Sequence, residues 1–65
     1  MALSDNIKKL REEKNLTQQQ LADQLYVSRQ TICRWENGSR CPDLIMAKKL
    51  ALELGVSMDE LVSDE

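Results

Sequence analysis

The 65-residue chain has no histidine and no phenylalanine, and only two cysteines, two glycines and one proline. A zinc site takes about four Cys or His ligands, which Cys33 and Cys41 cannot supply, so we expect no metal and no cofactor. Without histidine the chain lacks the commonest general base, and no Gly-rich phosphate loop is present. We therefore expect a protein that is not an enzyme.

Aromatic side chains are also scarce, since Tyr26 and Trp35 are the only ones, so Leu, Ile, Val, Ala and Met must build the core. No apolar run approaches the roughly 18 residues that a membrane span needs. The first residues lack the apolar stretch of a signal peptide. We expect no membrane partner and a cytoplasmic location, where both thiols stay reduced. A redox switch that uses the two thiols is the alternative.

Charge is unevenly distributed, although the net charge is only −2. Residues 1–27 are balanced and residues 28–49 carry three more bases than acids, whereas residues 50–65 carry five acids and no base. The pI near 5.0 argues mildly against a nucleic-acid partner. A local basic face can nevertheless bind phosphates while an acidic tail points elsewhere.

The apolar pattern is helical throughout, and no stretch alternates apolar and polar residues over the length of a strand. Thr17 with Gln20, and Ser57 with Glu60, fit the capping box that begins a helix. Caps and breakers predict helices from Ser4 to Lys14, from Thr17 to Leu25, from Ser28 to Gly38, from Leu44 to Leu54 and from Ser57 to Val62. We therefore expect one all-α domain over residues 1–65, a compact bundle of five short helices.

The segment from Gln18 to Trp35 is the most informative part of the chain. Only Tyr26 and Val27 separate its two helices, and Ser28 caps the second. A link this short forces the two axes to cross steeply, which is the helix-turn-helix arrangement. Ala22 supplies the small residue that such a crossing needs.

One face of the helix that begins at Ser28 is rich in hydrogen-bond donors. At about 100° per residue, an arc of about 140° holds Arg29, Gln30, Cys33, Arg34 and Asn37. Ile32 and Trp35 fall on the opposite side and can pack against the core. Arg can bind guanine through two donors and Gln can pair with adenine in the major groove. A merely solvated helix face is the alternative interpretation.

Six short stretches support the DNA interpretation. They are IKKLREEK at residues 7–14, LTQQQLA at 16–22, VSRQTI at 27–32, WENG at 35–38, PDL at 42–44 and GVS at 55–57. Each alone is weak. Together, without insertions, they resemble the Cro/repressor family of helix-turn-helix domains, also called the xenobiotic-response-element family. The resemblance implies a lambda-repressor-like fold and a sequence-specific transcription regulator, a repressor, that reads the major groove with the helix beginning at Ser28.

The resemblance also implies roles for individual residues. Base contacts would come from Arg29, Gln30 and Arg34, with Thr31 and Cys33 near the groove. Phosphate contacts would come from Thr17 and Gln18, aided by helix N-terminal amides, and from Asn37, Ser39 and Arg40. Arg11 and Glu36 match positions that form a partly buried ion pair; two solvated charges are the alternative.

Two features depart from the family. Tyr26 stands where the family usually has glycine, so the turn is either strained at positive φ or relaxed with the ring exposed. Ile45 and Leu52 lie opposite an expected core stripe of Leu44, Ala47, Ala51 and Leu54. They form a candidate dimer or partner patch, to which Met58 or Leu61 could add.

The expected partners follow from these features. Double-stranded DNA comes first, bound by a homodimer whose half-sites lie about one helical turn apart. The alternative is a protein-interaction module, such as an antitoxin that holds a toxin through residues 62–65 or through the Ile45 and Leu52 patch.

Overall fold

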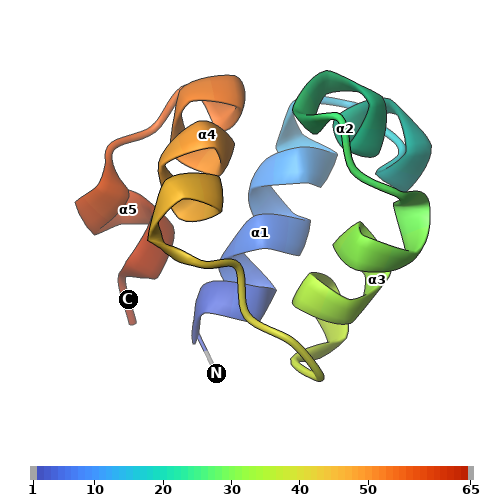
Figure 1. Ribbon diagram of the computed structural model, residues 1–65. Helices are drawn as coiled ribbons and strands as arrows, with labels where there is room; N and C mark the ends of the chain where they lie inside the picture. The colour runs from blue at the N-terminus through green and yellow to red at the C-terminus, as the bar shows by residue number, and fades with distance from the viewer. Residues whose placement is uncertain (1, 65) are drawn as a thin grey trace.

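The computed structural model describes residues 2–64, which fold into helices joined by short turns (Figure 1). The helices are α1 (Ala2–Glu13), α2 (Gln18–Leu25), α3 (Arg29–Asn37), α4 (Leu44–Leu54) and α5 (Met58–Val62). No strand forms among these residues, so the expected all-α bundle is confirmed. The largest difference in the helix ends is in α1, which begins at Ala2 rather than at Ser4.

Side-chain caps fix where four of the helices begin. Thr17 Oγ1 accepts a hydrogen bond from the Gln20 amide at 3.0 Å, and Gln20 Oε1 accepts one from the Thr17 amide at 2.8 Å. Ser57 and Glu60 form the same reciprocal pair at the start of α5. Both predicted capping boxes are therefore present, and they satisfy amides that the helix itself leaves without acceptors.

Three helices end in the same left-handed turn. Asn15, Tyr26 and Gly55 follow α1, α2 and α4 with φ values of 58°, 59° and 72°. In each turn the next residue donates its amide hydrogen to a carbonyl five positions back; for Tyr26 this bond joins Val27 to Ala22 at 3.0 Å. This pattern is the Schellman motif. The turn at Tyr26 is therefore the strained alternative, and its side chain is also 94% exposed.

A single core joins the helices. Its largest fully buried side chains are Ile7, Leu21, Ile32, Leu50, Leu54 and Leu61. Ala22 is fully buried, and α2 packs against α3. Trp35 is 6% exposed and completes the inner side of α3. α3 therefore packs on the core through Ile32 and Trp35, and its opposite side is exposed to solvent.

Two expectations about the apolar surface are wrong. Leu61 is fully buried, because the short helix α5 packs against α1 and α4 with this side chain in the core; Leu61 therefore cannot belong to a surface patch. Leu44 is 77% exposed, because it lies in the first turn of α4, which the bundle leaves uncovered. Leu50 takes its place in the core. Met58 is half-buried against the core, whereas Ile45 and Leu52 are exposed.

The arrangement separates two surfaces. α3 lies on the opposite side of α1 from α4 and α5 (Figure 1). The exposed side chains of α3 and the exposed Ile45 and Leu52 of α4 therefore belong to helices on opposite sides of α1. None of the helices formed by residues 2–64 has the length and apolar composition needed to cross a lipid bilayer.

Candidate nucleic-acid interface

The exposed side of α3 presents most of the side chains expected to reach DNA bases. Arg29, Gln30 and Arg34 are exposed, whereas Thr31 and Cys33 are half-buried. Ser28 accepts a hydrogen bond from the Thr31 amide, and the two hydroxyls lie 2.9 Å apart. The first turn of α3 is therefore held by its own cap, and the donors beyond it project from a fixed helix.

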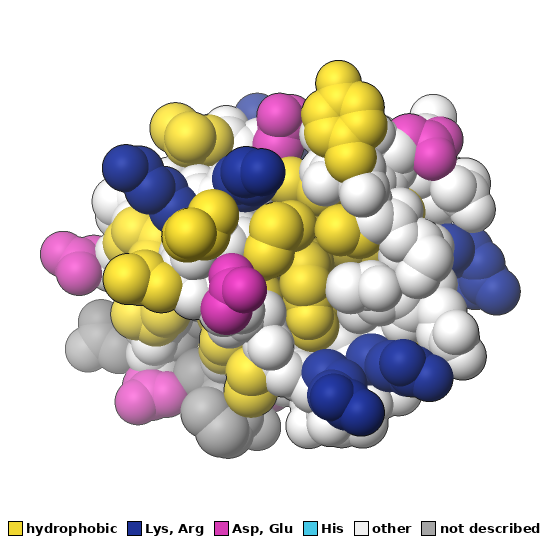
Figure 2. All heavy atoms as spheres, viewed as in Figure 1, with side chains coloured by type: hydrophobic (Ala, Val, Ile, Leu, Met, Phe, Trp, Pro, Cys, Tyr) yellow, Lys and Arg dark blue, Asp and Glu magenta, His cyan; other side chains and the backbone are white. Residues whose placement is uncertain are grey.

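A basic hollow lies at the end of α3. Its volume is about 270 Å³, and its lining is Thr31, Arg34, Trp35, Arg40 and Cys41. Figure 2 shows Lys and Arg side chains gathered over the end of α3 and the loop that follows it. Two guanidinium groups beside a hydroxyl suit an anionic group such as a phosphate, since arginine can present two parallel donors to its oxygens.

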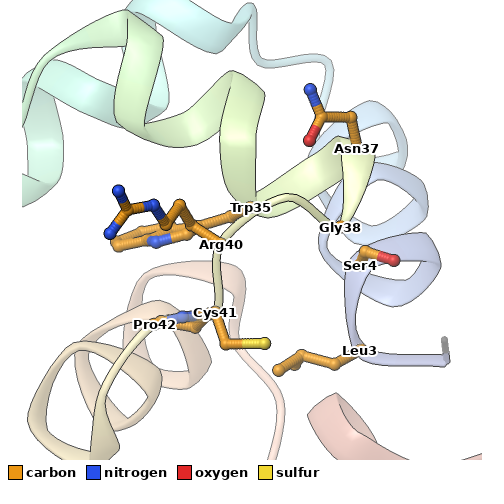
Figure 3. Close-up of a pocket in the computed structure, with 8 residues that line it drawn as sticks. All are labelled: Leu3, Ser4, Trp35, Asn37, Gly38, Arg40, Cys41 and Pro42. Carbon is orange, nitrogen blue, oxygen red and sulfur yellow. The ribbon is translucent and has the colours of Figure 1, made fainter.

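The loop after α3 is ordered by its own hydrogen bonds. Gly38 follows the helix with φ of 81°, and the Arg40 amide donates to the Arg34 carbonyl at 3.2 Å. Asn37 Oδ1 accepts from the Ser39 amide at 2.8 Å. A second hollow of about 260 Å³ lies under this loop, with the Asn37 amide pointing away from it (Figure 3). The loop is thus held in place beside α3.

An ion pair ties α3 to α1. Arg11 Nε lies 2.6 Å from Glu36 Oε2, Arg11 Nη2 donates to Glu36 Oε1 at 3.1 Å, and the side chains are 11% and 4% exposed. Arg11 Nη1 also donates to the Leu16 carbonyl at 2.6 Å. The hydrogen bond to Glu36 raises the pKa of Arg11 above its ordinary value, although burial opposes it. Arg11 and Glu36 therefore form the partly buried ion pair rather than two solvated charges.

Gln18 is engaged at both ends of its amide. Its Nε2 donates to Glu36 Oε1 at 3.1 Å, and its Oε1 accepts from Arg29 Nη1 at 3.3 Å. The sequence assigned separate roles to Gln18, Glu36 and Arg29 and did not predict the hydrogen bonds that join them. The predicted steep crossing of α2 and α3 was the available signal, because it brings the start of α2 close to the outer side of α3.

The remaining candidates for metal or redox chemistry are few. Cys33 and Cys41 are free thiols, the first half-buried and the second exposed. Within residues 2–64, no group of three or more Cys, Asp or Glu side chains is placed to hold a metal ion.

Comparison with known proteins gives one consistent result. The helix-turn-helix family profile matches residues 7–61. The HTH-type transcriptional activator BcrR of Enterococcus faecalis is 45% identical over all of this chain, which covers 32% of that protein. The cryptic phage CTXphi transcriptional repressor RstR of Vibrio cholerae is 39% identical over 94% of this chain and 55% of its own length. The chain thus spans about a third to about half of these relatives.

A solved structure has the same fold. The crystal structure of a transcriptional regulator from Listeria innocua matches with a TM-score of 0.87 and 30% sequence identity. The match covers 97% of this chain and 59% of that one. The arrangement of α1 to α5 is therefore shared with a transcriptional regulator.

Proposed function

Because this chain belongs to the helix-turn-helix family, which includes transcriptional regulators, we propose that it is a repressor that recognises one DNA sequence through α3. The observation that carries the proposal is the exposed row of Arg29, Gln30 and Arg34 on a helix whose other side is buried. Fixed donors of these types read base edges in the major groove. Thr31 and Cys33 are half-buried on the same helix and would lie near the groove.

Phosphate contacts would flank the bases on both sides of α3. Arg40 lines the basic hollow with Arg34, and neighbouring Asn37 and Ser39 would add donors to the DNA backbone. At the other side, the Thr17 hydroxyl and the second hydrogen on Gln18 Nε2 would donate to one phosphate beside the start of α2. These contacts would position α3 without reading sequence.

A homodimer would give useful affinity to so small a domain. Ile45 and Leu52 are 67% and 73% exposed on α4, so a second copy could pack there while both α3 helices reach DNA. Half-sites would then lie about 34 Å apart, one turn of the duplex. Sedimentation of an Ile45→Glu/Leu52→Glu variant tests this: we expect monomers, and an unchanged dimer would exclude the patch. Purification with a stoichiometric partner protein would instead favour the antitoxin alternative.

A repressor of this kind would act by occupying a promoter in the cytoplasm, and the name of the relative RstR supports the proposed sign. RstR carries the name repressor and BcrR the name activator, so the sign requires its own assay. A reporter driven by a promoter that overlaps the selected site should lose expression when the protein is present. Increased expression would reverse the proposed sign but leave DNA recognition intact.

The test of recognition is selection of bound duplexes from a random pool. We expect a symmetric site, with affinity that falls steeply with salt as phosphate contacts release counterions. Arg34→Ala should relax the preference at one base pair. Lys48→Ala, which removes an exposed basic residue from α4, should leave the base preference unchanged. Failure to retard any duplex at low salt would refute the proposal.

A further inference from the structure

We propose that Glu36 and Gln18 are positioning residues that hold the Arg29 guanidinium ready to read guanine. The inference rests on the proposed DNA-binding function and adds to it a role for a buried carboxylate that never reaches DNA. Its basis is one continuous series of hydrogen bonds, from Arg11 through Glu36 and Gln18 to Arg29.

The first link fixes Glu36. Arg11 donates to both carboxylate oxygens from its Nε and Nη2, and the Glu36 side chain is only 4% exposed. Two parallel bonds of this kind set the plane of the carboxylate as well as its position. Oε1 therefore has a fixed place, and it is the oxygen that also accepts from Gln18.

The second link sets which way the Gln18 amide faces. A carboxylate oxygen only accepts hydrogen bonds and a guanidinium only donates them. The amide nitrogen must therefore face Glu36 and the amide oxygen must face Arg29, and they form hydrogen bonds of 3.1 Å and 3.3 Å with these two side chains. A flipped amide would place oxygen against oxygen and nitrogen against nitrogen. By accepting from the Gln18 nitrogen, Glu36 thus orients the Gln18 amide so that its oxygen faces Arg29.

The third link prepares Arg29 for a base. Nη1 is the donor that Gln18 holds, so the edge formed by Nε and Nη2 is left for O6 and N7 of guanine. An exposed arginine otherwise loses side-chain freedom when it binds, and a guanidinium held beforehand loses less. The preference for guanine should therefore depend on Gln18, even if Gln18 touches no base.

A double-mutant cycle tests the inference on the selected operator. The base pair read by Arg29 is the one at which Arg29→Ala loses its preference. Gln18→Met keeps the length of the side chain and removes both hydrogen bonds. We expect it to lower the guanine preference there by roughly tenfold, about the worth of one hydrogen bond to a charged group. In the Arg29→Ala background it should leave that preference unchanged.

Gln19→Met is the matched control, because Gln19 is the next residue of α2 and bonds only to Asp23 among the hydrogen bonds seen. It should leave the guanine preference intact. If Gln18→Met weakens all operators alike, without changing the preference at the Arg29 base pair, Gln18 only binds phosphate and the inference is wrong. A loss of preference that persists without Arg29 would also overturn it.

A second readout needs no DNA. The heteronuclear NOE of the Arg29 Nε–H group reports how freely its side chain moves. It should be high in the wild type and in Gln19→Met, and lower in both Gln18→Met and Glu36→Gln. Equal values in all four proteins would refute the positioning role. Since this measurement uses free protein, failure of the positioning contacts and failure of DNA binding can be told apart.

Discussion

The left-handed turn at Tyr26 allows a sharp test of backbone strain. The same hydrogen-bonded turn occurs after Asn15, Tyr26 and Gly55, with φ values between 58° and 72°. Glycine adopts this conformation freely and asparagine tolerates it, whereas for tyrosine it is unusual. The Tyr26 side chain is 94% exposed, so its removal costs little burial. We predict that Tyr26→Gly stabilises the domain.

The magnitude follows from two opposing effects. Positive φ costs a residue with a Cβ atom about 1–2 kcal/mol, and glycine gives back about 0.5–1 kcal/mol through the entropy of the unfolded chain. The difference between the midpoints of these two ranges gives a net gain of about 0.75 kcal/mol. For a domain of this size, that raises Tm by roughly 2–8 °C. Thermal and urea unfolding followed by circular dichroism would measure it.

Two variants serve as controls. Tyr26→Ala removes the ring but keeps the Cβ atom, so it should leave stability nearly unchanged. Asn15→Gly relieves less strain and should gain less than Tyr26→Gly. If Tyr26→Gly lowers Tm, or if Tyr26→Ala stabilises as much as glycine does, strain in the backbone is not the cause.

Three further predictions concern stability and can be measured by urea unfolding. Arg11→Ala should lower the free energy of unfolding by about 3–5 kcal/mol, because it leaves the buried carboxylate of Glu36 without its cationic partner. The double variant Arg11→Met/Glu36→Leu removes both charges and should lower it by less; an equal or larger loss of stability would contradict this explanation. Leu61→Ala should lower the free energy of unfolding by about 2–5 kcal/mol, whereas Leu44→Ala, at an exposed site outside the Ile45 and Leu52 patch, should change it by no more than about 0.5 kcal/mol, and similar values would mean that burial is misassigned. Thr17→Ala should cost about 1 kcal/mol by removing the cap of α2; no loss would show that the backbone amides find other partners.

Local features of the structure could be predicted from the sequence. The caps at Thr17, Ser28 and Ser57 depend on residues within one turn, so their patterns indicate where helices begin. The two sides of α3 follow from helical periodicity, and the burial of Ile32 and Trp35 confirms that prediction. The helix-turn-helix crossing follows from the short link between its helices.

Features that depend on distant neighbours could not be predicted this way. Leu44 and Leu61 fit either surface or core until the packing of α4 and α5 is known. The turn at Tyr26 had two alternatives in the sequence, and the bond from Val27 to Ala22 accompanies the strained one. The bonds that join Gln18 to Glu36 and to Arg29 link three helix positions that no local pattern connects.

We propose that the exposed side of α3 enters a DNA groove. The most direct test of this proposal is an NMR titration of the isotopically labelled protein with its selected duplex. The largest amide shifts should map to residues 17–18 and 28–41, whereas residues 58–62 of α5 should change little. Shifts concentrated on α4 and α5, with α3 unchanged, would show that α3 does not bind the duplex.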